Sequence, residues 1–125
     1  MSVIVRDDGF HAEDFAGTAV EIASDTKPDE LVQLAFGADM VRILFPSFSD
    51  GRGFSLARRL RDAGYVGRVR AVGPVIADQY AMARRSGFDE VEIPDDLAAR
   101  QPQDQWIFRA DWRAHDYRAR MKGAD

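Results

Sequence analysis

Apolar residues along the chain follow two alternating spacings, one typical of buried strands and the other of helices. Short runs rich in β-branched or aromatic residues occupy positions 18–24, 40–48, 68–73 and 88–93. Between these runs, apolar residues recur three or four positions apart, as on one face of a helix. The segment from residue 18 to residue 94 is therefore predicted to run strand, helix, strand, helix, strand, helix, strand.

This alternation, with short connections, predicts parallel strands joined by right-handed crossovers in a sheet covered by helices. The expected fold class is α/β, a single domain built on an open four-stranded, mainly parallel sheet. Half of a (βα) barrel is the alternative, because the local pattern does not separate the two. Residues 1–17 are expected to form an N-terminal hairpin around the Asp8-Gly9 turn signal, and residues 95–125 a helical C-terminal extension.

Several residues mark the expected ends of the helices. Thr26 is a candidate N-cap of the first helix, Pro28 suits its first turn, and Gly37 is placed to end it. The second helix is expected to start near Phe54 or Ser55, and Gly64 follows its last apolar residue.

Composition narrows the function classes. A chain of 125 residues can form one domain with its own core. It has no cysteine, so this chain offers no disulfide, no thiolate metal site and no iron–sulfur ligand. The first residues carry no basic leader and no long apolar run, so a cytoplasmic location without a membrane partner is expected. The net charge of −4 argues against a nucleic-acid partner.

Charge is unevenly distributed along the chain. Residues 6–30 are mainly acidic, whereas residues 52–70 contain six arginines and a single aspartate. Arginine forks suit the capture of carboxylate, phosphate or sulfate-like oxyanions, so the central region is a candidate anion-binding surface. The alternative is a solvated helix face that pairs with the acidic N-terminal third.

The stretch Ser49–Gly53, with sequence Ser-Asp-Gly-Arg-Gly, joins the second core strand to an arginine-rich helix. In an open parallel sheet, ligands bind beyond the carboxyl ends of the strands, and a second turn at Gly73 is expected on the same edge. Backbone amides of the glycines, the helix N-terminus and the Arg52 fork could together hold an oxyanion. The candidate anion site comprises Ser49, Asp50, Gly51, Arg52, Gly53, Ser55, Arg70, Gly73, Asp78 and Gln79.

A purely structural turn is the alternative. Gly51 and Gly53 would then supply positive φ angles, while Asp50 or Ser49 would cap the helix. Arg70 lies in a strand that helices should cover, so it needs a carboxylate partner. The candidates for that partner are Asp50, Asp78 and Glu92.

The C-terminal segment 104–121 is predicted to be a helix with aromatic residues on two faces. Such a helix must dock on the domain, and it could offer its second face to a partner; the alternative is that both faces are buried in this chain. The candidate partner surface comprises Arg58, Arg59, Trp106, Trp112 and Tyr117.

The two histidines, His11 and His115, are isolated, and no nucleotide-binding or metal-ligand pattern is present in the sequence, so no cofactor or metal is expected.

Three blocks in the centre of the chain carry a family resemblance: FPSFSDGRGFSLARRLR (45–61), RAVG (70–73) and DQYAMARRSGFD (78–89). In order and spacing they resemble the bacterial domain-of-unknown-function family 934. That family is encoded beside sulfite reductase and phosphoadenylyl-sulfate reductase in sulfate-assimilation gene clusters, and is sometimes labelled a probable oxidoreductase. The family commonly has Lys where Ser47 stands and Cys where Ser86 stands. The resemblance implies no catalytic residue.

Two hypotheses of function follow. In the first, the chain is an accessory or partner protein of assimilatory sulfite reduction that binds sulfite reductase or another enzyme of the pathway. In the second, it is a small enzyme or an oxyanion sensor that uses Asp50, Arg52, Ser55, Arg70 and Asp78 at the strand ends. An oxidoreductase of this kind would have to borrow a nicotinamide or flavin.

Overall fold

The computed structural model describes residues 2–110, and its parallel strands follow the predicted alternation. Four strands pair side by side in parallel: β3 (Ala19–Ala23), β4 (Met40–Leu44), β5 (Arg68–Val72) and β6 (Glu90–Pro94). They are connected by α1 (Pro28–Ala35), α2 (Arg52–Asp62), and the short 3-10 helix η1 (Ala77–Gln79) followed by α3 (Tyr80–Ser86). The α/β class and the order of the elements are confirmed.

Within residues 2–110 the sheet has six strands: the four predicted parallel strands are present, but the prediction that the sheet consists of these four alone was wrong. The N-terminal hairpin, β1 (Ser2–Arg6) and β2 (Gly9–His11), does not stand apart from the sheet, because β1 pairs antiparallel with β6. The strand order is β2-β1-β6-β5-β4-β3. Without β1, the outer edge of β6 would present unpaired backbone groups, and the hairpin satisfies them. The hairpin turn is Asp7-Asp8, one position earlier than predicted, and Gly9 opens β2 with φ of 124°.

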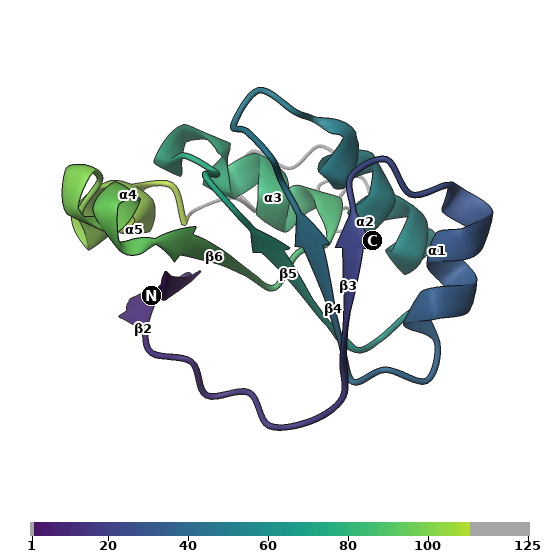
Figure 1. Ribbon diagram of the computed structural model, residues 1–125. Helices are drawn as coiled ribbons and strands as arrows, with labels where there is room; N and C mark the ends of the chain where they lie inside the picture. Colours follow the sequence, from purple (N-terminus) through teal and green to yellow (C-terminus); the bar gives the residue numbers. More distant parts are fainter. Residues whose placement is uncertain (1, 111–125) are drawn as a thin grey trace, which may run out of the picture.

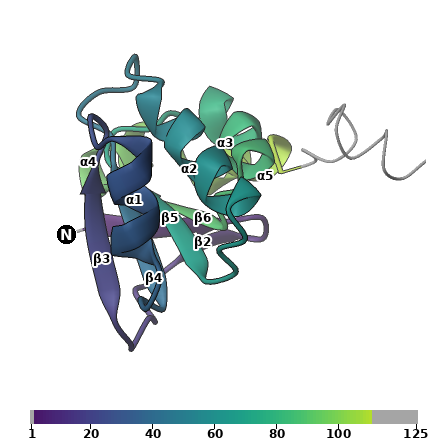
Figure 2. The same ribbon diagram turned by 90° about the vertical axis from the view of Figure 1, so that its right-hand side faces the viewer.

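All three crossover helices lie on one face of the sheet, as Figures 1 and 2 show. The reason is that β3 to β6 pair in sequence order, so every right-handed crossover places its helix on the same side. This is the winding of half a barrel, although the antiparallel hairpin extends the sheet in a way that a barrel does not. Among the strands described, the parallel part has no reversal of order, so it lacks the crevice expected at such a reversal.

Two short C-terminal helices extend the helical layer. The first, α4 (Asp95–Arg100), contacts β6 and β1, and α5 (Gln103–Phe108) contacts β2. The main core lies between this layer and the sheet and contains the inward side chains of the strands, among them Val41, Ile43 and Val91. None of the helices in residues 2–110 covers the other face, which we call the open face. The connection from β2 to β3 passes along its lower edge in Figure 1.

Helix ends differ in detail from the sequence predictions. The N-cap of α1 is Lys27 instead of Thr26, and Gly37, with φ of 102°, lies two residues beyond the end of the helix. The second helix starts at Arg52, two residues earlier than predicted, because Gly51 has a helical conformation. No helix among the residues described is long and apolar enough to cross a membrane.

Candidate functional site

The two predicted turns lie next to each other at the carboxyl edge of the sheet. Gln79 Nε2 donates a hydrogen bond of 2.5 Å to the carbonyl oxygen of Phe48, which ties the β5–η1 turn to the β4–α2 turn. Gly73 has φ of 135°, and a Cβ atom at this position would clash with the carbonyl oxygen of Phe45. Glycine at position 73 therefore allows the two turns to touch.

Asp50 and Arg52 form a compact cluster with a residue that the sequence analysis missed, Ser24 at the end of β3. Asp50 accepts hydrogen bonds from Arg52 Nε at 3.0 Å and Arg52 Nη2 at 2.7 Å. The Ser24 hydroxyl donates to Asp50 Oδ2 at 3.0 Å and accepts from Arg52 Nη2 at 3.2 Å. Hydrogen bonds from the Arg52 side chain and backbone hold the pKa of Asp50 well below its usual range. The Arg52 cation thus faces a carboxylate of its own chain.

The glycines of this turn do not have positive φ angles, so that part of the structural alternative was wrong. Gly51 has φ of −86° and open space around its Cα. A Cβ on Gly53 would overlap the ring of Phe45, so this glycine makes room for core packing. The N-cap of α2 is Gly51, so the predicted capping of this helix by the side chain of Asp50 or Ser49 was wrong. Asp50 Oδ1 instead accepts the backbone N–H of Arg52 at 3.1 Å, a local bond that stabilises the turn before the helix.

The remaining hydroxyl groups of the predicted site stay near the surface. Ser49 bonds the hydroxyl of Ser47 at 2.8 Å, and Ser55 is exposed in α2. The side chains of Ser49 and Ser55 form no hydrogen bond with Asp50 or Arg52, so among the residues described the cluster at this turn is limited to Ser24, Asp50 and Arg52.

Arg70 lies away from the two turns. Its side chain is on the open face, fully buried, and it bonds Glu90 at 2.6 Å, Glu13 at 2.6 Å and Glu92 at 2.9 Å. Of its three predicted partners, only Glu92 is one. Burial alone would lower the pKa of Arg70, but the hydrogen bonds that Arg70 donates to these glutamates outweigh it and raise the pKa.

Asp78 is also separate from Arg52, because it pairs with Arg109 at 2.8 Å, next to α5. The charged residues of the predicted site, Asp50, Arg52, Arg70 and Asp78, therefore fall into three ion-paired groups and do not line one pocket.

The surroundings of Arg70 form a charged row that the sequence analysis did not detect. The row crosses five neighbouring strands of the open face and contains Arg6, Glu90, Arg70, Arg42 and Glu21. Glu92 bonds both Arg42 and Arg70, so the two adjacent cations share a carboxylate. The sequence does contain a signal for this row: each parallel strand carries a charged residue near its middle, which does not fit a face covered by apolar helices.

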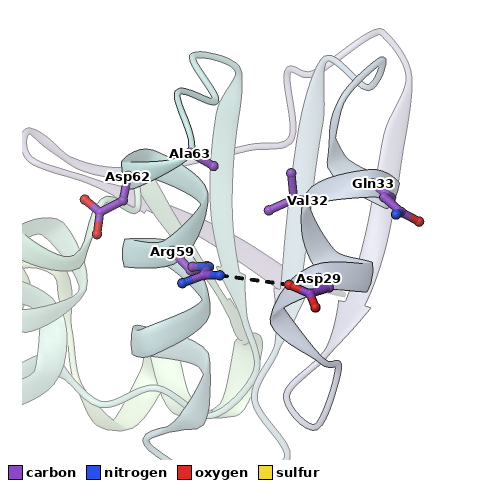
Figure 3. A pocket seen from close by; sticks show the side chains of 6 residues that line it. All are labelled: Asp29, Val32, Gln33, Arg59, Asp62 and Ala63. Carbon is purple, nitrogen blue, oxygen red and sulfur yellow. Dashed lines mark ion pairs between the residues drawn. The ribbon is translucent and has the colours of Figure 1, made fainter.

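The predicted partner surface is only partly exposed. Arg58 and Arg59 lie on the outside of α2, and Arg59 points toward Asp29 of α1 at 3.9 Å (Figure 3). Trp106 is fully buried, stacks edge-on against Tyr80 at 6.0 Å and donates Nε1–H to Gln101 at 2.9 Å, so its assignment to a partner surface was wrong. Trp112 and Tyr117 lie outside the residues described.

Two surface cavities accompany these elements. One, of about 610 Å³, lies between α1 and α2 and is lined by Asp29, Val32, Gln33, Arg59, Asp62 and Ala63 (Figure 3). The other, of about 400 Å³, is lined by Ala77, Asp78, Asp104, Gln105, Phe108 and Arg109. Only Asp78 of the candidate anion site contributes to either. Residues 2–110 contain no group of three or more His, Asp or Glu side chains placed to hold a metal ion.

Comparison of the sequence with known proteins identifies the family to which this chain belongs. No curated protein and no solved structure matches the chain. The model of a bacterial family matches residues 19–122, which include the whole parallel sheet, both turns and the helices between them. With most of its length matched, the chain belongs to the family described as bacterial protein of unknown function, DUF934.

Proposed function

We propose that this protein is an accessory protein of assimilatory sulfite reduction, which acts in the cytoplasm by binding sulfite reductase or another enzyme of sulfate assimilation. The gene neighbourhood implied by the family resemblance supports the pathway. The geometry of the candidate site supports a binding role over catalysis.

The observation that carries this proposal is that the charged side chains of the candidate site already form ion pairs with other residues of the same chain. Asp50 pairs with Arg52, Arg70 with three glutamates, and Asp78 with Arg109. A substrate oxyanion would have to compete with a carboxylate that is already bound in two-point geometry by the same chain. These residues therefore suit a scaffold that holds turns, strands and a helix in place for contact with a partner.

Direct binding tests the proposal. The purified protein is titrated against the hemoprotein component of sulfite reductase from the same bacterium, and a strain lacking the gene is grown on sulfate and on cysteine as sulfur sources. A complex at micromolar concentration, together with a growth defect confined to sulfate, is the expected result. No complex with the hemoprotein and equal growth on both sources would overturn the proposal.

Oxyanion binding is the competing function, and one feature favours it: the Arg52 side chain is 60% exposed, and its Nη1 donates none of the hydrogen bonds seen within residues 2–110. Thermal unfolding with added sulfite, sulfate, adenylyl sulfate or a nicotinamide separates the two functions. If an anion raises the melting temperature of the wild type but not of Arg52→Ala, the turn is a binding site. If no anion does so, its role is structural.

A further inference from the structure

Almost every arginine in the part of the chain described is ion-paired. Ten of the twelve arginines in residues 2–110 lie in an ion pair with an aspartate or glutamate. The exceptions are Arg58 of α2 and Arg85 of α3, which have no ion-pair or hydrogen-bond partner among these residues. Two cations are therefore without counter-ions from the part of the chain that the structure describes.

These two arginines belong to neighbouring helices of the outer layer. Arg61 of α2 donates a 2.9 Å hydrogen bond to the carbonyl oxygen of Gly87, the residue that ends α3, so the two helices touch there. Arg58 lies one turn before Arg61 on the same side of α2. Figure 2 shows α2 and α3 side by side on the face away from the sheet.

An exposed apolar residue accompanies the free cations. Met82 lies three residues before Arg85 on α3, hence on the same face of the helix, and it is 52% exposed. In addition, Arg85 Nε is buried without a hydrogen-bond acceptor among the residues described. The two Nη groups of Arg85 are not buried and have no hydrogen bond among the residues described, so they are the donors that a partner could reach.

We propose that the outer surface of α2 and α3 around Arg58, Met82 and Arg85 docks on an acidic surface of a protein partner. We call it the α2–α3 surface. Two arginine forks that have no carboxylate partner within residues 2–110 suit carboxylates of another protein, and the exposed methionine one turn from Arg85 suits an apolar side chain. Nucleic acid is disfavoured by the net charge of −4. This inference depends on the proposed function in one respect, namely that the partner is sulfite reductase or another enzyme of sulfate assimilation.

Charge reversal tests the α2–α3 surface. Arg58→Glu is the main variant, because Arg58 is exposed and has no ion pair or side-chain hydrogen bond within residues 2–110. The double variant with Arg85→Glu extends it. The matched control is Arg100→Glu on α4, an exposed arginine paired locally with Asp96. Against the sulfite reductase hemoprotein, Arg58→Glu should weaken binding about tenfold or more, and Arg100→Glu should leave it unchanged. Circular dichroism verifies that each variant is folded.

Failure of this proposal can be told apart from failure of the proposed function. If the hemoprotein binds Arg58→Glu as tightly as the wild type, the α2–α3 surface is excluded while the partner stands. If the hemoprotein does not bind at all, the wild-type protein is titrated with a synthetic peptide rich in glutamate and leucine. Binding is then monitored by the changes in the amide chemical shifts of the protein. Shifts confined to residues 55–59 and 82–86 then support the surface, and their absence overturns it. Competition by duplex DNA would overturn the assignment to a protein partner.

Discussion

Arg70 Nε and Glu90 Oε2 are 2.6 Å apart on the open face of the sheet, and neither side chain is more than 2% exposed. The two residues are register partners on β5 and β6, so the backbone ladder itself brings them together. Glu13, from the connection between β2 and β3, forms a further ion pair with Arg70 at 2.6 Å on the solvent side of the cluster. A buried charge is tolerated only with its partners present, so this connection is bound to the sheet by the same ion pair that neutralises Arg70.

Removing the cation from this cluster should be costly. Arg70→Met leaves the carboxylate of Glu90 buried without its main partner, and we expect the free energy of unfolding to fall by about 3–5 kcal/mol. Adding Glu90→Gln should recover part of the loss, because the unpaired buried charge disappears. Urea unfolding measures both variants, with Arg100→Met on the surface as control. A loss below about 1 kcal/mol for Arg70→Met would show that the cluster contributes little.

Stability should fall in acid partly because of Glu13. The hydrogen bonds from Arg70 lower the pKa of Glu13 from 4.5 to about 2. Between these two pH values the unfolded chain binds a proton at this residue that the folded chain does not, so the free energy of unfolding rises with pH there. The contribution is complete above pH 4.5 and is lost as the pH drops toward about 2.

The variant Glu13→Gln isolates this effect. It should be less stable than the wild type at neutral pH, and its unfolding free energy should depend less on pH between 4.5 and about 2. Urea unfolding at several pH values measures the slope in that interval. Equal slopes for the wild type and for Glu13→Gln would show that the carboxylate is not linked to folding. Glu30→Gln on the exposed side of α1 is the matched control.

The parallel part of the fold could be predicted from sequence because its signals are local. Apolar runs of strand length and helices with one apolar stripe fixed the order of elements between residues 18 and 94. The pairing of β1 with β6 joins residues far apart in the chain, and no local pattern specifies it. Nor did the pattern indicate that all crossover helices lie on one face, which depends on the order of strands in the sheet.

The site was predicted less well, for a physical reason. Sequence placed the Asp50–Arg52 turn and the Gly73 turn on one edge, and the structure has them there in contact. Yet sequence could not tell which carboxylate each arginine would meet. Arg70 was assigned to that edge, whereas strand alternation directs its side chain to the open face, where Glu13 and Glu90 meet it.

A side chain at position 73 should disturb the contact between the two turns. Gly73→Ala would have to adopt a φ of 135° and would clash with the carbonyl oxygen of Phe45, a backbone atom that cannot rotate away. We expect a loss of about 1–3 kcal/mol in the free energy of unfolding. Gly51→Ala is the matched control in the neighbouring turn, since its φ is −86° and no atom lies within 4 Å of the added Cβ. Equal stability of the two variants, measured by urea unfolding, would contradict the close approach of the turns.

The aromatic residue at position 106 should stabilise the fold instead of binding a partner. Trp106 is fully buried and packs edge-on against Tyr80 of α3, so Trp106→Ala should lower the free energy of unfolding by about 3–5 kcal/mol. Trp106→Phe keeps an aromatic ring but loses the hydrogen bond to Gln101, and its loss should be smaller. Thermal and urea unfolding measure both variants. If Trp106→Ala is as stable as the wild type but no longer binds the sulfite reductase hemoprotein, position 106 belongs to a partner surface and its burial against Tyr80 is not what the fold depends on.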